Sequence, residues 1–171
     1  MSAPAFSVWV TGPEQGAVEA IAEELARRLA ARRMAVEVLD RRTPGIDALA
    51  GEGLERRAAF VAGLLARHGV AAVVALPVAA RAARERVRTE LGRMIEVYAR
   101  PAHQAPPDTT YEPPERPEVE ITVPEPSPGA GVEQVLRTLE VLELLPRDED
   151  RAYSEEEERE VIRRLKAFGY L

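Results

Sequence analysis

The 171-residue chain contains no cysteine and only two histidines, His68 and His103. Without cysteine it can form no disulfide, bind no zinc ion through thiolates and use no cysteine nucleophile. Two histidines alone cannot build a histidine-rich metal site. The sequence therefore gives no candidate metal ligands of these types, and we expect no metal centre.

Long apolar runs and a secretory leader are also missing. No run approaches the roughly 18 to 20 apolar residues that span a membrane, and the start MSAPAFSVWV lacks the basic region of a signal peptide. The net charge of −6 argues against general binding to nucleic acids. The sequence thus predicts a cytoplasmic protein that engages neither membranes nor nucleic acids.

What the chain does have is a regular alternation of apolar segments. With 46% hydrophobic and 30% charged residues it is suited to one globular domain, which we place at residues 1–145. Short apolar runs typical of strands alternate with stretches of helical periodicity. This alternation predicts a parallel sheet covered by helices on both faces, an α/β three-layer sandwich. The expected strands lie near residues 7–10, 36–39, 70–76, 94–99 and 119–123, and the expected helices near residues 15–33, 54–67, 79–92 and 131–145.

Two segments depart from this alternation. Residues 101–128 hold nine of the fourteen prolines, so we expect an extended connector with one short strand and no long helix. Residues 146–171 form a tail in which Ser154 and Glu157 match a helix capping box. The tail helix would have one apolar face, and it is expected to dock on its own domain or on a protein partner. That face carries Val161, Ile162, Leu165 and Phe168.

The stretch VWVTGPEQGAVE has the position of a phosphate-binding turn between the first strand and the first helix. A P-loop reads G-x-x-x-x-G-K-S/T, in which backbone N–H groups and the lysine hold phosphates and the hydroxyl holds magnesium. Gly12 opens the loop, but Ala17, Val18 and Glu19 stand where the second glycine, the lysine and the hydroxyl belong. Starting from Gly16 instead supplies no cation either. Gly12 and Gly16 are therefore candidates for a degenerate phosphate loop only.

Taken together, the ordered segments resemble the adenylylsulfate (APS) kinases, which phosphorylate APS with ATP in sulfate assimilation. The matching pieces are VWVTG, AVEVLD, ERRAAFVAGLLARHGVAAVVA, RAARERVRTELGRMIEVYA and YEPPERPEVEI, and they cover roughly residues 7–145. The resemblance implies a P-loop-kinase-like fold with a five-stranded parallel sheet. It also implies nucleotide and sulfonucleotide ligands and a homodimer.

The departures from this family concern its chemistry. The family's loop resembles G-L-S-G-x-G-K-S-T, and its second strand ends in L-D-G-D, of which Asp40 is retained while Arg41 and Arg42 follow. Asp40 is thus the one retained candidate for a catalytic carboxylate, with a loop or helix cap as the alternative role. The family's lid, with R-D-x-K-G-L-Y and F-T-G-I-D, has no counterpart between Arg100 and Tyr111.

Arginines form the other candidate site. Arg56 and Arg57 match the family's N-x-R-R segment, Arg81 matches the arginine of S-P-x-R, and Arg84 follows one turn later. Arginine forks suit phosphate or sulfate oxygens, so these residues are candidates for binding an anionic substrate. The alternative is that they lie on solvated helix faces and pair with nearby glutamates.

Three functions follow from this mixture of matches and departures. The first is a degenerate APS-kinase-like protein without kinase activity, acting as a nucleotide- or anion-binding or regulatory module linked to sulfate assimilation. The second is an active or weakly active adenylylsulfate kinase, or another phosphotransferase with a rebuilt site, which alone would require ATP and Mg²⁺. The third is an assembly or adaptor subunit.

Overall fold

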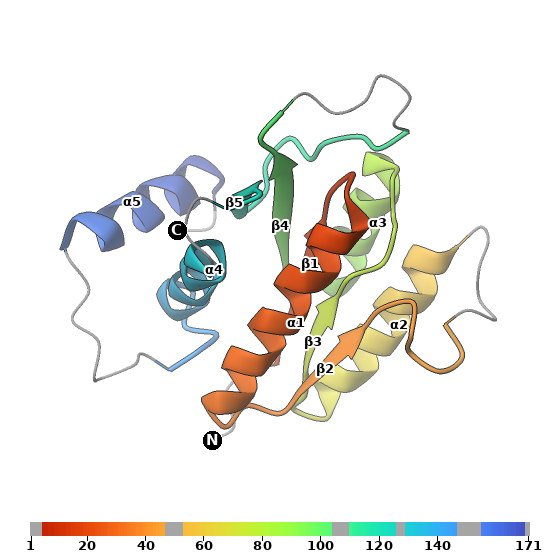
Figure 1. Ribbon diagram of the computed structural model, residues 1–171. Coiled ribbons are helices and arrows are strands. Elements are labelled where there is room, and N and C mark those ends of the chain that lie inside the picture. The colour runs from red at the N-terminus through yellow and green to blue at the C-terminus, as the bar shows by residue number, and fades with distance from the viewer. Residues whose placement is uncertain (1–4, 47–52, 104–109, 126–128, 147–154, 170–171) are drawn as a thin grey trace.

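The computed structural model describes residues 5–46, 53–103, 110–125, 129–146 and 155–169. It contains a five-stranded parallel sheet with the order β2-β3-β1-β4-β5 (Figure 1). The predicted parallel α/β fold is therefore confirmed. The strands are β1 (Ser7–Thr11), β2 (Val36–Leu39), β3 (Ala71–Val74), β4 (Met94–Pro101) and β5 (Val119–Val123).

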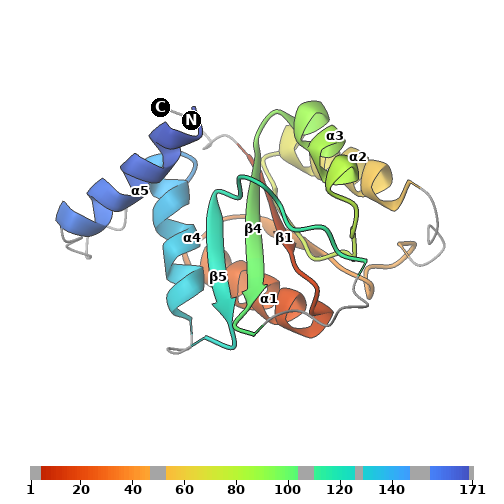
Figure 2. The same cartoon turned by 90° about the horizontal axis from the view of Figure 1, so that it is seen from above.

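Helices cover both faces of this sheet. One face is covered by α1 (Gln15–Ala31) and α4 (Ala130–Val141), and the other by α2 (Leu54–Arg67) and α3 (Arg81–Leu91) (Figure 2). The tail forms α5 (Glu155–Ala167), which lies against α4. No helix in the described ranges has both the length and the apolar character needed to cross a membrane.

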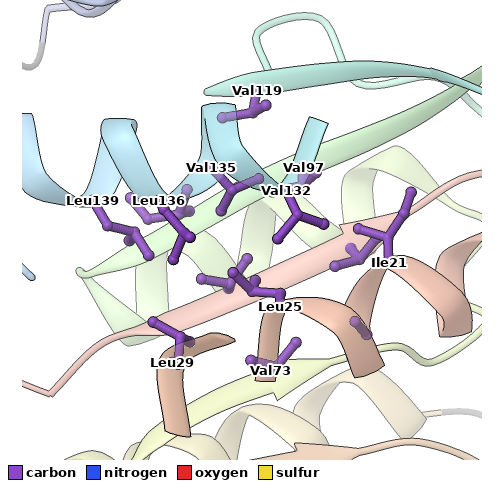
Figure 3. Close-up of a cluster of buried hydrophobic side chains, with 14 of the residues drawn as sticks. Ile21, Leu25, Leu29, Val73, Val97, Val119, Val132, Val135, Leu136 and Leu139 are labelled. Atoms are coloured by element: carbon purple, nitrogen blue, oxygen red, sulfur yellow. The ribbon is translucent and has the colours of Figure 1, made fainter. Parts of the chain in front are cut away.

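Burial on one face or on both explains why α1 and β3 have different patterns of apolar residues in the sequence. Along α1, large apolar residues recur every three or four positions and are buried against the sheet (Figure 3). In β3 every residue is buried, because helices cover the strand from both sides. A continuous apolar run such as AAVV is what that environment requires.

Several helix ends differ from the predicted ones. Helix α1 ends at Ala31, and Arg33 follows with a φ of 61°, a left-handed conformation that stops the helix. Helix α4 ends at Val141, and Glu143 has a φ of 57°. The predicted capping box stays a prediction, because Ser154 lies outside the described residues.

Leu165 anchors α5. Its side chain is only 1% exposed, and Val161, Ile162 and Phe168 are partly buried. These residues lie at helical spacing on one face of the tail, as the sequence predicted. In the structure that face therefore packs on the chain's own domain.

Candidate functional site

The turn between β1 and α1 lies at the carboxyl end of the central strand. β1 pairs with β3 on one side and with β4 on the other. In open parallel sheets, ligands bind at such a switch point. Here the turn borders a cavity of about 150 Å³, whose other walls are residues 76–79 and Tyr111. That volume is below the roughly 300 to 1,000 Å³ of common ligand pockets.

The two glycines of the loop have different surroundings. A Cβ atom at Gly12 would lie 2.7 Å from the carbonyl oxygen of Ala99 and 3.1 Å from the Cβ of Ala99. A Cβ atom at Gly16 would meet nothing within 4 Å. Gly12 is therefore required by the close approach of the loop to β4, whereas Gly16 faces open space.

The positions expected to hold a lysine and a hydroxyl are occupied in a different way. Val18 is 1% exposed and belongs to the hydrophobic core. The Glu19 carboxylate accepts hydrogen bonds from Gln15 Nε2 at 3.1 Å and from Arg41 Nε at 3.1 Å. Gln15 Nε2 also donates to the Ala75 carbonyl at 2.7 Å. The first two turns of α1 thus present an engaged carboxylate and no lysine.

Asp40 follows β2 at the edge of the sheet and is 5% exposed. Its carboxylate accepts hydrogen bonds from the Arg42 backbone N–H at 2.8 Å and from Arg42 Nε at 3.0 Å. Burial raises the pKa of Asp40, but the bonds from Arg42 outweigh burial and the net pKa is lowered. Because β3 separates β2 from β1, Asp40 lies about 10 Å to the side of the central strand. In this position it fixes its own loop, as expected of a loop cap.

Arg84 does not lie on a solvated helix face, contrary to that alternative. It is 1% exposed, and its Nε donates to Glu96 at 2.9 Å. The same guanidinium donates to the carbonyls of Val78 and Ala79, each at 2.8 Å, and to that of Glu112. These bonds direct its donors into the protein, so Arg84 has a structural role in this conformation.

The other candidate arginines are exposed to different degrees. Arg81 is partly exposed and forms an ion pair with Glu115 at 3.0 Å, and its backbone N–H donates to the Glu112 carboxylate at 2.8 Å. Arg56 and Arg57 are exposed in the first turn of α2. The four arginines therefore do not share one exposed surface, because Arg84 is buried. Anion binding by Arg56, Arg57 and Arg81 stays a prediction.

Tyr111 is a site residue that the sequence did not single out. Its hydroxyl forms a hydrogen bond with Thr11 Oγ1, and its ring stacks on Tyr98 with centroids 6.0 Å apart. The Arg84 guanidinium lies 4.9 Å from the centre of the same ring. Burial raises the pKa of Tyr111 to about 12. Tyr111 therefore forms a neutral, fixed wall over the end of β1.

A second cavity lies on the other side of α1. It has a volume of about 330 Å³ and is lined mainly by apolar side chains of α1, of the turn after β5 and of α4. Ala17, Ile21 and Val132 contribute to this surface, with Glu24 and Glu125 among the lining residues. The first turns of α1 therefore separate a small cavity with a mixed polar and apolar lining from a larger apolar one. Within the described ranges, no group of three or more carboxylates or histidines could hold a metal ion.

In comparisons with known proteins, the sequence of this chain is similar to members of one family. The model of the adenylylsulphate kinase family matches residues 4–107. A probable adenylyl-sulfate kinase from Pyrococcus abyssi is 31% identical, over 82% of this chain and 98% of its own length. An adenylyl-sulfate kinase from Synechococcus sp. strain JA-2-3B'a(2-13) is also 31% identical, over 81% of this chain and 97% of its own length.

Solved structures show the same fold. A hexameric APS kinase from Thiobacillus denitrificans superimposes with a TM-score of 0.70 and 25% identity, over 86% of this chain and 31% of that longer chain. The Mycobacterium tuberculosis APS kinase in complex with AMPPNP and APS has a TM-score of 0.68 and 23% identity, over 80% of this chain and 98% of its own.

Proposed function

Because the chain belongs to the adenylylsulphate kinase family, we propose that it is a nucleotide- or oxyanion-binding module linked to sulfate assimilation that no longer transfers phosphate efficiently. One observation carries this proposal. A buried valine and an engaged glutamate, Val18 and Glu19, occupy the positions of the catalytic lysine and the magnesium-binding hydroxyl.

The physical reason is electrostatic. Phosphoryl transfer depends on positioning and on neutralising the charge of the phosphates, and a lysine and a bound magnesium ion supply most of that charge. Val18 supplies none. Glu19 adds a negative charge, and its repulsion of a phosphate about 4 Å away is about 1 to 4 kcal/mol, depending on the local dielectric. Together these changes lower the expected rate by several orders of magnitude.

Binding without transfer is supported by the two cavities beside α1. The apolar cavity of about 330 Å³ has a volume and lining suited to a flat ring such as a nucleobase. The smaller cavity, whose lining includes Thr11, Gln15 and Tyr111, lies at the other side of the same helical turns. A nucleotide could bridge the start of α1 with its base in the first cavity and its phosphate near the second.

The comparisons favour a second candidate function, an active adenylylsulfate kinase with a rebuilt site. Relatives that this chain matches over nearly their whole length are named adenylyl-sulfate kinases. In such an enzyme, which would use ATP and Mg²⁺, cations outside the loop would have to replace the lysine. Arg41 and Arg42, which follow β2, form ion pairs with Glu19 and Glu23 of α1 and are the candidates for that role.

A coupled ADP-release assay with ATP, Mg²⁺ and APS separates the two functions. An active relative assayed in parallel serves as the control. We expect no turnover above about 0.01 per second, whereas a rate within about a hundredfold of the 1 to 100 per second of typical kinases would overturn the proposal. A thermal-shift series with ADP, ATP, APS and PAPS tests binding itself. The binding function would be rejected if none of these ligands raised the melting temperature.

We further propose that the protein forms a homodimer through α2. The side chains of Phe60 and Leu64 are 68% and 40% exposed, one turn apart on the outer surface of this helix. Large apolar side chains gathered on an exposed surface are typical of interaction sites. The Thiobacillus denitrificans relative, which is described as hexameric, supports self-association in this family. An adaptor role for the chain would use the same kind of surface.

A further inference from the structure

The Glu19 carboxylate lies at a point where hydrogen-bond donors from the first turn of α1 and from the loop after β2 converge. Its Oε1 atom accepts hydrogen bonds from Gln15 Nε2 and from Arg41 Nε, each at 3.1 Å, and a second Arg41 nitrogen lies 3.1 Å away in an ion pair. One carboxylate oxygen thus contacts both a side-chain amide and a guanidinium group. Guanidinium groups also bind phosphate and sulfate oxygens through charge-assisted contacts of this kind.

Contacts other than the one to Glu19 hold Gln15 and the backbone of Arg41 in place. Gln15 Nε2 also donates to the Ala75 carbonyl at 2.7 Å, just after β3. The backbone around Arg41 is fixed by its neighbours, because the Asp40 carboxylate accepts from the Arg42 N–H at 2.8 Å and the Asp40 N–H donates to Thr43 Oγ1 at 3.0 Å. Gln15 and the Arg41 backbone would therefore stay near their positions if the carboxylate moved away, and the exposed Arg41 guanidinium would then be able to turn toward a ligand.

We propose that Gln15 and Arg41 form a binding site for a tetrahedral oxyanion, and that Glu19 occupies this site as an internal competitor in the free protein. The inference rests on the proposed binding function and adds to it the class of ligand and a reason for weak affinity. The ligand is a phosphate or sulfate group, either as a free ion or as the end of a nucleotide.

The exposure of the pair makes Glu19 displaceable. The Arg41 side chain is 57% exposed and that of Glu19 is 24% exposed. Ion pairs this open to solvent contribute little to stability, so a ligand with two negative charges can compete for the same donors. Arg42 differs, because it binds both Glu23 and the nearly buried Asp40. Of the two adjacent arginines, Arg41 is therefore the one that a ligand can recruit.

The test measures phosphate binding after the competitor is removed. Titration calorimetry of the full chain with inorganic phosphate, sulfate and ADP should show at least tenfold tighter binding for Glu19→Gln than for the unchanged protein. Adding Arg41→Gln to that variant should abolish the gain. Glu23→Gln is the matched control, because it removes the same charge from the exposed side of the same helix and should leave affinity within about twofold.

Each outcome bears on the site. An Arg41-dependent gain for phosphate or sulfate supports a site for a free ion, and a gain confined to ADP supports a site for a nucleotide phosphate. Equal affinities for Glu19→Gln and Glu23→Gln, or a gain that survives Arg41→Gln, would reject the site in favour of a general charge effect. Glu19→Ala provides a second variant if Glu19→Gln folds poorly, as judged by circular dichroism. Kinase turnover by the unchanged protein would reject the proposed function but not this calorimetric result.

Discussion

Gly12 and Gly16 show how two residues of the same type in one loop can have different roles. The sequence made both candidates for contacting a phosphate. In the structure the backbone of β4 leaves no room for a side chain at Gly12, whereas Gly16 borders open space at the start of α1. Only Gly12 is therefore needed for the fold itself.

Substituting each glycine by alanine should give opposite results. In Gly12→Ala the new methyl group would lie 2.7 Å from the Ala99 carbonyl oxygen, a backbone atom that cannot turn away. Overpacking of this kind costs about 1 to 3 kcal/mol. Gly16→Ala should be neutral or stabilising by up to about 1 kcal/mol, because alanine favours the helix. Urea denaturation measures both, and a loss of stability in Gly16→Ala would show that its surroundings are not open.

Tyr111 should keep its proton to unusually high pH. Burial raises its pKa from an ordinary value of 10.0 to about 12. Because the folded state holds this proton more tightly than the unfolded state, the stabilisation is present below about pH 10 and is lost as the pH rises toward about 12. Ultraviolet titration of tyrosinate, compared between the unchanged protein and Tyr111→Phe, isolates this group from the other three of the four tyrosines. A difference curve with a midpoint near pH 10 would contradict the burial of the hydroxyl.

At the scale of elements, buried charges join α3 to the sheet. Arg84 and Arg88 of α3 bind Glu96 of β4, and Arg88 also binds Glu118 just before β5. Both glutamates are at most 2% exposed, and burial raises the pKa of Glu96 despite its arginine neighbours. The network thereby ties the segment that leads from Tyr111 to β5 firmly against the core.

Breaking this network from one side should be costly. Arg84→Met leaves Glu96 buried with one charged partner fewer, and loss of one partner of a buried pair costs about 3 to 5 kcal/mol. Adding Glu96→Gln should recover part of the loss, so the two changes should be non-additive in urea denaturation. Arg86→Met is the control, since Arg86 is 60% exposed and its pair with Glu55 should contribute at most about 1 kcal/mol. Additive effects would mean that Arg84 and Glu96 do not act as a pair.

The tail helix gives a second prediction at this scale. Leu165 is 1% exposed where α5 lies against α4, so Leu165→Ala should cost about 2 to 4 kcal/mol or release α5 altogether. Lys166→Ala, on the exposed side of the same turn, should leave the melting temperature nearly unchanged. Deletion of residues 147–171 should lower the melting temperature at least as much as Leu165→Ala does. An unchanged melting temperature in the deletion would show that α5 does not stabilise the domain.

For the whole molecule, the fold could be predicted from local patterns, but the state of the site could not. Apolar runs such as AAVV and the spacing of Val18, Leu25 and Leu29 identify buried strands and an amphipathic helix without any knowledge of contacts. The absence of a loop lysine is equally visible in the sequence. The contact between Glu19 and Arg41 is not visible there, because it joins α1 to the loop after β2, which only the completed fold brings together.

Arg84 is a residue whose burial could not be predicted from its sequence context alone. The sequence of α3 suggests that its arginines lie on a solvated face, because charged residues are usually exposed. Ala83 and Val87 define the buried stripe of α3, and Arg84 lies directly beside it with its charge matched by Glu96. The available signal was a pair of glutamates beside or within apolar strand segments, Glu96 in MIEVYA and Glu118 before VEITV. Buried acids require buried partners, and the arginine-rich helix α3, which precedes β4, supplies them.

Self-association is the prediction that concerns the molecule as a whole. Phe60 and Leu64 are the large apolar side chains that the described part of the chain leaves exposed, and α2 lies on the outside of its layer (Figure 2). If they form the dimer interface, light scattering at micromolar concentration should give twice the monomer mass, and Phe60→Asp should give the monomer because a carboxylate would be buried without a partner. Ala130→Asp, which adds the same charge to an exposed position on the opposite face of the sheet, should leave the dimer intact. A monomeric unchanged protein would contradict the dimer, and a dimer that survives Phe60→Asp would move the interface away from α2.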